Sequence, residues 1–320
     1  MRRRDLVVVA VAVAAVAAGA LVMKFRAVDG GGAGGRGLRV VVTVAPLVEL
    51  ARSVAPEGSE VRALMPPGQS EHGYEFTPGD LAALAEADVV VYVGLGLEPQ
   101  VEEFVAMHPT RSRQDVCFAR AVGLGDVQGV DGHDDEDDGH GHAHEDDHGV
   151  DPHLWLDPAM VRQLVPVLSG AMGAAARARG IDSPEASSKL VAAEEALEAR
   201  VDALDAEFRA KLSAFKGSAI VTHHRAWGRL ASRYGLEVAA TLRPVESAEP
   251  TPGQVAEVMR ALEEHKAGAV FVEPQFDSTS VRRIAETAGV KVERLDPLGD
   301  GDWFATMRAN LESLVRGLSK

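Results

Sequence analysis

The chain has 320 residues, of which 46% are hydrophobic, so it can bury the cores of two ordinary domains. Its formal net charge is −15, but nine carboxylates lie between Asp131 and Asp147 with no Lys or Arg, which leaves −6 for the remainder. Because the acidity is local, nothing indicates nucleic-acid binding. The single cysteine, Cys117, excludes an intramolecular disulfide and a zinc cluster of several thiolates. Any metal site must therefore use histidine and carboxylate.

The N-terminal segment is typical of an exported or membrane-anchored protein. Three arginines, Arg2 to Arg4, precede eighteen uncharged residues from Leu6 to Met23. This apolar run is longer than a usual signal-peptide core and just long enough to span a bilayer, so it favours an uncleaved anchor over a cleaved signal peptide. The arginines are expected to stay inside the cell and to place the rest of the chain outside. Six glycines between Gly30 and Gly37 form a flexible tether, so residues 1–37 are assigned to signal or anchor plus tether.

Short runs of β-branched and other apolar residues alternate with helical patterns along the rest of the chain. The expected strands are Arg39 to Val44, Val61 to Met65, Val89 to Val93, Val116 to Ala119, Ala219 to Thr222, Leu236 to Thr241, Ala269 to Val272 and Val290 to Leu295. This alternation is typical of βαβ units and predicts an α/β fold with two parallel-sheet lobes. The N-terminal lobe is assigned to residues 38–182 and the C-terminal lobe to residues 217–320.

A long linker helix is predicted between the lobes, over residues 183–216. Apolar side chains recur at steps of three, four and seven, at Leu190, Leu197, Val201, Leu204, Phe208, Leu212 and Phe215. Ser183 and Pro184 are typical of a helix start, and Gly217 is typical of an end. At 1.5 Å per residue the helix would be about 48 Å long, enough to run along both lobes and to restrict hinge motion.

Residues 131–150 are predicted to form a disordered loop in the N-terminal lobe. The stretch from Asp131 to Asp151 holds five histidines and many carboxylates but almost nothing apolar, so it can bind divalent cations but cannot form a core. Capture of metal for a nearby site is the favoured role, with storage or a purely solvated tract as alternatives. His144 to His148 spells the HExxH motif of zinc peptidases, but the surrounding glycines and aspartates oppose the helix which that motif requires. With no nucleophile motif and no phosphate-binding glycine loop in the sequence, we do not expect an enzyme.

Metal-binding side chains follow several predicted strands. Ligands of open parallel sheets gather at the carboxyl ends of the strands. His72 lies in the loop after the second expected strand, and His153 directly follows the histidine-rich loop. His223 and His224 follow the fifth strand, and Asp296 follows the last. Three imidazoles and one carboxylate would complete a zinc tetrahedron, although an aspartate before a proline and a glycine-rich turn, such as Asp296, often serves only the backbone.

Six short motifs occur in a specific order along the chain. They are His72-Gly73-Tyr74-Glu75 with Thr77-Pro78, Ala87 to Gly94 (ADVVVYVG), Asp151 to Leu156 (DPHLWL), Thr222 to Gly228 (THHRAWG), Phe271 to Gln275 (FVEPQ) and Leu295 to Gly299 (LDPLG). Together they resemble the zinc and manganese solute-binding proteins of ABC transporters, specifically the ZnuA-like zinc branch. The resemblance spans Arg39 to Leu318 and implies two α/β lobes joined by a long helix, with a metal site in the cleft between the lobes.

The resemblance also implies a ligand set. Carried over position by position, the ligands are His72, His153, His224 and Asp296. In the motif Thr222 to Gly228 the ligand aligns with His224 and not with His223. Glu71 matches a glutamate of some zinc-binding members and competes with Asp296 or water for the fourth position. Glu273 and Arg225 are expected either to orient ligands and backbone or to form an ion pair between the lobes.

Histidine at the third ligand position favours zinc, because imidazole suits zinc whereas manganese-binding relatives usually have a glutamate there. The resemblance therefore implies a monomeric, extracytoplasmic zinc-binding component of an ABC uptake system, in the periplasm or on the outer face of the cell membrane. It would bind Zn²⁺ as cargo and deliver it to a membrane permease that a cytoplasmic ATPase drives. The alternatives are a surface metal buffer or adhesin acting through the histidine-rich loop, and a manganese-selective member. Because coordinating imidazoles must be neutral, occupancy is expected to fall below about pH 6 to 6.5.

Overall fold

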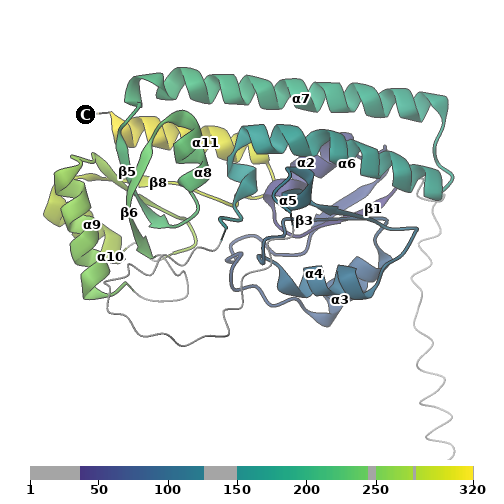
Figure 1. The fold of residues 1–320 in the computed structure, drawn as a ribbon, viewed down its shortest axis with the longest axis horizontal. Helices are drawn as coiled ribbons and strands as arrows, with labels where there is room; N and C mark the ends of the chain where they lie inside the picture. The colour runs from purple at the N-terminus through teal and green to yellow at the C-terminus, as the bar shows by residue number, and fades with distance from the viewer. Residues whose placement is uncertain (1–36, 126–149, 244–249, 277–278, 320) are drawn as a thin grey trace, which may run out of the picture. The chain divides into compact units, whose positions relative to one another are not determined.

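The computed structural model describes residues 37–125, 150–243, 250–276 and 279–319 (Figure 1). These residues belong to one compact unit, Arg36–Lys320. The predicted N-terminal anchor and almost all of the predicted histidine-rich loop lie outside the described residues.

The N-terminal lobe contains a four-stranded parallel sheet in the order β2-β1-β3-β4. Its strands are β1 (Arg39–Val42), β2 (Glu60–Ala63), β3 (Val89–Tyr92) and β4 (Gln114–Cys117). Its helices are α2 (Pro46–Val54), α3 (Pro78–Glu86), α4 (Pro99–Met107), α5 (Phe118–Ala121) and α6 (Pro158–Ala178), with the short 3-10 helix η1 (Leu154–Leu156) before α6. All four residues of the central strand β3 are buried, as expected for a parallel strand with both faces covered.

The C-terminal lobe repeats this arrangement with a parallel sheet in the order β6-β5-β7-β8. Its strands are β5 (Ala219–His224), β6 (Glu237–Arg243), β7 (Ala269–Val272) and β8 (Lys291–Arg294). Its helices are α8 (Gly228–Tyr234), α9 (Pro252–Glu264), α10 (Thr279–Ala288) and α11 (Trp303–Leu318). The predicted fold of two parallel-sheet lobes is confirmed, and each of the eight expected strands overlaps an observed one.

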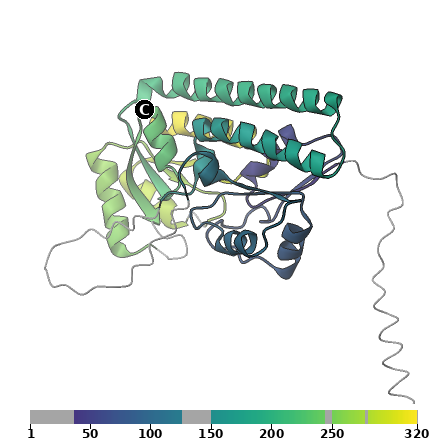
Figure 2. The same ribbon diagram turned by 45° about the vertical axis from the view of Figure 1, so that its right-hand side comes forward.

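The long helix between the lobes is α7 (Pro184–Leu212), followed by the 3-10 turn η2 (Ser213–Phe215). The Ser183 side chain caps its start by accepting a hydrogen bond from the Ala186 N–H. Five residues of the predicted apolar stripe are buried: Leu197, Val201, Leu204, Phe208 and Leu212. The helix packs against α2 and α6 of one lobe and against α8 and α11 of the other (Figures 1 and 2). It therefore braces both lobes, as the sequence predicts.

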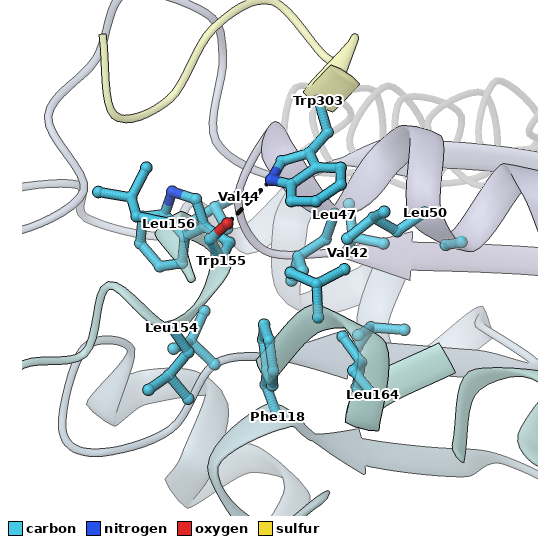
Figure 3. Close-up of a cluster of buried hydrophobic side chains, with 14 of the residues drawn as sticks. Val42, Val44, Leu47, Leu50, Phe118, Leu154, Trp155, Leu156, Leu164 and Trp303 are labelled. Carbon is cyan, nitrogen blue, oxygen red and sulfur yellow. Dashed lines mark hydrogen bonds between the residues drawn. The ribbon is translucent and has the colours of Figure 1, made fainter. Parts of the chain in front are cut away.

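A shared hydrophobic core also joins the lobes. In Figure 3, Trp303 of α11 lies beside Val42 and Leu47 of the N-terminal lobe, and its indole N–H donates to the Trp155 carbonyl oxygen at 2.9 Å. Trp155 and Trp303 are buried. A second cluster of buried residues, which includes Val258 of α9, lies within the C-terminal lobe. Because the larger core extends through both lobes, moving one lobe against the other would expose apolar surface.

Helix α6 is, among the described helices, the one long and apolar enough to cross a membrane by length and composition. Ten of its residues are buried, and it packs against α7, α2 and the strands β3 and β4. This packing accounts for its apolar character.

Candidate metal centre

Four side chains from three separate segments converge where the two lobes meet. Glu71 and His72 lie in the loop between β2 and α3, His153 immediately precedes η1, and His224 is the last residue of β5. Each offers one ligand atom, and these atoms all lie within 4.8 Å of one another. Two of the three segments follow the carboxyl ends of parallel strands, where ligands of such sheets commonly bind.

The distances between these atoms fit a single small cation. Nε2 of His72 lies 3.3 Å from Nε2 of His153 and 3.2 Å from Nε2 of His224. Nε2 of His153 lies 3.2 Å from Oε1 of Glu71. Zinc bonds of about 2.0–2.2 Å in a tetrahedron place neighbouring ligand atoms roughly 3.3–3.6 Å apart. These three distances match the spacing of neighbouring ligands of one tetrahedral ion, and all four atoms lie within 4.8 Å of one another.

Three of the four side chains are inaccessible to solvent. Glu71 is 4% exposed, His153 1% and His224 2%, whereas His72 lies on the exposed side. Oε2 of Glu71 is buried without a hydrogen-bond partner in the described part of the chain. A buried carboxylate oxygen without a partner is costly, and a cation at this position would offset that cost.

Carboxylates behind two of the histidines fix the orientation of the rings. Nδ1 of His153 lies 2.7 Å from Oδ1 of Asp151, and Nδ1 of His224 lies 2.9 Å from Oε1 of Glu273. Each contact occupies Nδ1 and leaves Nε2 directed at the other ligands. The guanidinium of Arg229, on α8, donates to the backbone carbonyl of Asp151 at 2.7 and 2.9 Å. Asp151 is therefore held from the opposite lobe.

The loop that carries Glu71 and His72 is fixed at its far end by the start of α3. Thr77 and Asp80 form a reciprocal capping box there. The Tyr74 hydroxyl donates to Oδ2 of Asp80 at 3.0 Å. This contact ties the middle of the loop to the helix, so the ligand pair is attached to a rigid element on one side.

Electrostatics in the cluster favour an exchange of a proton for a metal ion. Burial raises the pKa of Glu71, but the hydrogen bond and charge of His153 outweigh burial and bring it to about 2. Burial lowers the pKa of His153, but its hydrogen bonds to Asp151 and Glu71 outweigh burial and raise it to about 9. Although part of His72 is exposed, desolvation of its ring within the cluster and the charge of His153 lower its pKa to about 4. At neutral pH His153 thus holds a proton between two carboxylates, at the point where a cation would bind.

Asp296 is not part of this cluster, although the resemblance names it, together with Glu71 and water, as a candidate for the fourth ligand. Its Oδ1 accepts hydrogen bonds from the backbone N–H groups of Leu298 and Gly299, at 3.0 and 2.9 Å. Asp296 also lines a separate cavity of about 640 Å³ with Gly68 and Gln69. The physical reason is local, because an aspartate that starts a tight turn uses its carboxylate on the backbone. The fourth side chain of the cluster is Glu71.

His223 is directed away from the cluster even though it precedes His224. Successive side chains of a strand point to opposite faces, and both residues lie in β5. The ring of His223 packs on Phe276, with ring centroids 4.7 Å apart. The structure thus brings together Glu71, His72, His153 and His224, and leaves out His223 and Asp296.

Sequence reasoning missed the contact of Asp151 with His153. The signal was present, because Asp151 lies two residues before His153 and its side chain also accepts the His153 N–H at 2.9 Å. An aspartate that bonds the backbone two residues onward is a common local motif. Here it brings the carboxylate within reach of the imidazole.

A cluster of three histidines and one carboxylate between two α/β lobes, with all of these side chains except His72 buried, defines a metal-binding protein of the two-lobed class. The family described as "Zinc-uptake complex component A periplasmic" matches residues 40–317, so the chain belongs to this family. It is 27% identical over 287 residues to the zinc-binding lipoprotein AdcA of Streptococcus pneumoniae, covering 87% of this chain and 55% of AdcA. It is 26% identical over 280 residues to the high-affinity zinc uptake system protein ZnuA of Yersinia pestis, covering 82% and 83% of the two chains. The chain thus spans about half the length of its AdcA relatives.

Solved structures share the fold. A crystal structure of ZnuA superimposes with a TM-score of 0.70 at 24% identity, covering 88% of this chain and 99% of that one. The periplasmic zinc-binding protein TroA from Treponema pallidum gives 0.71 at 21% identity, with the same coverage. At these identities the likeness supports the two-lobed architecture, and the metal site rests on the geometry above.

Proposed function

We propose that this protein is the extracytoplasmic zinc-binding component of an ABC uptake system. It binds one Zn²⁺ as cargo on Glu71, His72, His153 and His224 and delivers the ion to a membrane permease with a cytoplasmic ATPase. The observation that carries the proposal is the convergence of three imidazole Nε2 atoms and a buried carboxylate oxygen. Such a site binds and releases an ion, and no catalytic role is proposed for it. The relatives support this proposal, since they include proteins named for zinc binding and zinc uptake.

The donor set favours zinc over manganese. Three of the four donors are imidazole nitrogens, which suit zinc, whereas manganese prefers carboxylate and carbonyl oxygens. His224 contributes an imidazole where a glutamate would favour manganese. Copper(II) and nickel(II) also suit nitrogen-rich sites, so biological supply contributes to selection.

Exchange of the ion is proposed to take place at the His72 side of the cluster. His72 is the exposed member of the set, while the other three side chains are buried. The shared core and α7 oppose a wide separation of the lobes. Movement of the loop between β2 and α3 would open the site at lower cost in exposed apolar surface.

The same proposal assigns a role to each segment of the chain. Residues 1–37 export or anchor the chain, 38–182 and 217–320 form the two lobes, and 183–216 link them. Residues 131–150 capture metal for the site, and the receptor acts as a monomer. The apolar run from Leu6 to Met23 after three arginines supports an extracytoplasmic location.

Zinc stoichiometry tests this function. Competition against a strong chelator is expected to show one tightly bound zinc, which His224→Ala abolishes and deletion of Asp131 to Gly149 leaves in place. Loss of tight zinc on deletion of the loop would instead favour a metal buffer that acts through that loop. Genes for a permease and an ATPase beside the gene for this protein would separate uptake from storage.

A further inference from the structure

Asp296 is hydrogen-bonded through both its side chain and its backbone to groups of the C-terminal lobe. Its carboxylate oxygen Oδ1 accepts two consecutive backbone N–H groups, from Leu298 and Gly299. Its own backbone N–H donates to Oδ1 of Asn310 at 2.8 Å, and Nδ2 of Asn310 donates to its carbonyl oxygen at 2.7 Å. Asn310 lies on α11 and is 2% exposed. The backbone of Asp296 is thus fixed to α11, and its side chain is fixed to the turn that follows it.

These bonds fix the turn from Pro297 to Gly299. Gly299 has a φ of +63°, a backbone conformation that favours glycine. A Cβ atom at this position would lie 2.1 Å from Oγ1 of Thr306, so the turn packs directly on α11. With the turn fixed by Asp296 at its start and by this close approach at its end, the direction of the Pro297 carbonyl is set.

The Pro297 carbonyl accepts a hydrogen bond from the indole N–H of Trp155 at 2.6 Å. Trp155 belongs to η1 of the other lobe and is completely buried, and its own carbonyl accepts the indole N–H of Trp303 (Figure 3). The Trp155 ring packs edge-on against the ring of His153, with centroids 5.3 Å apart. A chain of contacts therefore leads from Asp296 through Pro297 and Trp155 to a ligand of the metal centre.

We propose that Asp296 is a positioning residue: its carboxylate shapes the turn whose Pro297 carbonyl holds Trp155, and through Trp155 sets the position of His153. This inference rests on the proposed zinc function and assigns a different role to a residue that the sequence predicts as a ligand. Zinc already has four donors in Glu71 and the three histidines, which completes a tetrahedral site. Partners that orient ligands commonly change metal affinity when they are replaced.

The substitution Asp296→Asn separates the two roles. Asparagine keeps an Oδ1 that accepts hydrogen bonds from the same two backbone N–H groups. It lacks the negative charge, so it cannot act as an anionic metal ligand. The zinc affinity of full-length Asp296→Asn, measured by chelator competition, is therefore expected to stay within about two-fold of wild type. Asp296→Ala removes the acceptor and is expected to weaken zinc binding by about ten-fold or more. Asp300→Ala, on the exposed part of the same loop, is the matched control and should leave the affinity unchanged.

A second pair of variants tests the link through Trp155 even where Asp296→Ala fails to fold. Trp155→Phe removes the indole N–H that bonds Pro297, and it is expected to weaken zinc binding by about ten-fold. Trp227→Phe removes an indole N–H that is equally buried but has no partner among the described residues. This control should bind zinc like wild type, because no hydrogen bond is lost.

The visible spectrum of the Co²⁺-loaded protein distinguishes a metal ligand from a residue that only positions a ligand. Because the d–d bands report the donor set, they should be the same in wild type and Asp296→Asn. Weakened binding and altered bands in Asp296→Asn would show that the carboxylate is a ligand and would overturn the inference. Wild-type affinity in both Asp296→Ala and Trp155→Phe would also overturn it. If wild type itself binds no tight zinc, or if His224→Ala does not reduce binding, the proposed function fails instead.

Discussion

Nδ1 of His224 lies 2.9 Å from a carboxylate oxygen of Glu273, and both residues are only 2% exposed. The other carboxylate oxygen of Glu273 accepts a hydrogen bond from Gln275 at 2.9 Å. Glu273 is therefore fixed in a position from which it orients the His224 ring. The sequence indicates Glu273 only as a candidate for orienting ligands or for an ion pair. The structure shows that it directly contacts His224, one of the side chains of the metal centre.

Replacing Glu273 is expected to weaken zinc binding without removing a ligand. Glu273→Gln keeps an acceptor for His224 but lacks the charge that strengthens the contact, so a loss of about ten-fold in affinity is expected. Glu273→Ala should cost more, because it leaves a buried imidazole N–H without a partner. Isothermal titration with a competing chelator measures both values. Glu286→Gln, on the exposed side of α10, serves as the control, and equal affinities for all of these variants would contradict the role of Glu273.

Zinc binding is expected to release about one proton at neutral pH. Hydrogen bonds to Asp151 and Glu71 outweigh burial and raise the pKa of His153 to about 9, so the metal-free protein holds a proton there that zinc must displace. His72, with a pKa of about 4, is already neutral. Zinc affinity should therefore rise by about ten-fold per pH unit from neutral pH until the pH passes the pKa of His153. Calorimetry in buffers of different ionisation enthalpy counts the protons, and a value of zero would contradict this mechanism.

The stability of the metal-free protein should fall as the pH rises, whereas its zinc affinity should rise. A histidine whose folded-state pKa is raised stabilises the folded protein fully below its unfolded pKa of about 6.5. This stabilisation is lost as the pH rises through the folded-state pKa of His153, about 9. Urea unfolding of the metal-free protein at a series of pH values should show this decline. The same series on His153→Gln should lack it, and an identical decline in that variant would assign the effect to another group.

Glu71 and Glu75 offer a matched pair within one loop. Glu71 is 4% exposed and contacts His153, whereas Glu75 is exposed. Glu71→Gln is expected to weaken zinc binding by about ten-fold or more, since an amide is a poorer zinc donor than a carboxylate. It should also lower the pKa of His153 and hence the number of protons released. Glu75→Gln should match wild type in both measurements, and a comparable loss from Glu75→Gln would show that loop charge, and not coordination, is responsible.

The packing of α7 against both lobes is expected to contribute several kcal/mol to the free energy of unfolding. Phe208 is completely buried and stacks with Tyr234 of α8, with ring centroids 5.0 Å apart. Phe208→Ala should lower the free energy of unfolding by about 3–5 kcal/mol. Val191 lies on the same helix but is 55% exposed, so Val191→Ala should change it by less than about 0.5 kcal/mol. Similar effects from the two substitutions, measured by urea unfolding, would contradict the packing of α7.

The sequence predicts the lobes and the long helix because both are encoded in local patterns. The run Val89-Val90-Val91-Tyr92 is apolar throughout, as a central parallel strand requires, and it forms β3. The apolar period of Leu197, Val201, Leu204 and Phe208 marks the buried side of α7. Strand boundaries differ by up to two residues, because strands end through hydrogen bonds that the apolar pattern does not determine.

The metal centre is harder to predict because it depends on distances between segments. Asp296 follows a strand in the same way as His224 does, yet its carboxylate bonds the turn that it starts. Only the family resemblance names Glu71 as a candidate ligand; the local pattern does not show that Glu71 reaches the cluster, since the loop from Leu64 to Thr77 must first fold back. The unperturbed histidine pKa likewise predicts a loss of zinc below about pH 6 to 6.5. Contact of His153 with two carboxylates moves the competition between proton and metal to higher pH.

Anomalous diffraction at the zinc absorption edge, from crystals of the zinc-loaded protein, tests the central claim most directly. We expect one strong peak between the lobes, about 2.0–2.2 Å from Nε2 of His72, His153 and His224 and from an oxygen of Glu71. A peak bound elsewhere, or no ordered zinc at these four side chains, would contradict the proposed site and with it the zinc-receptor function.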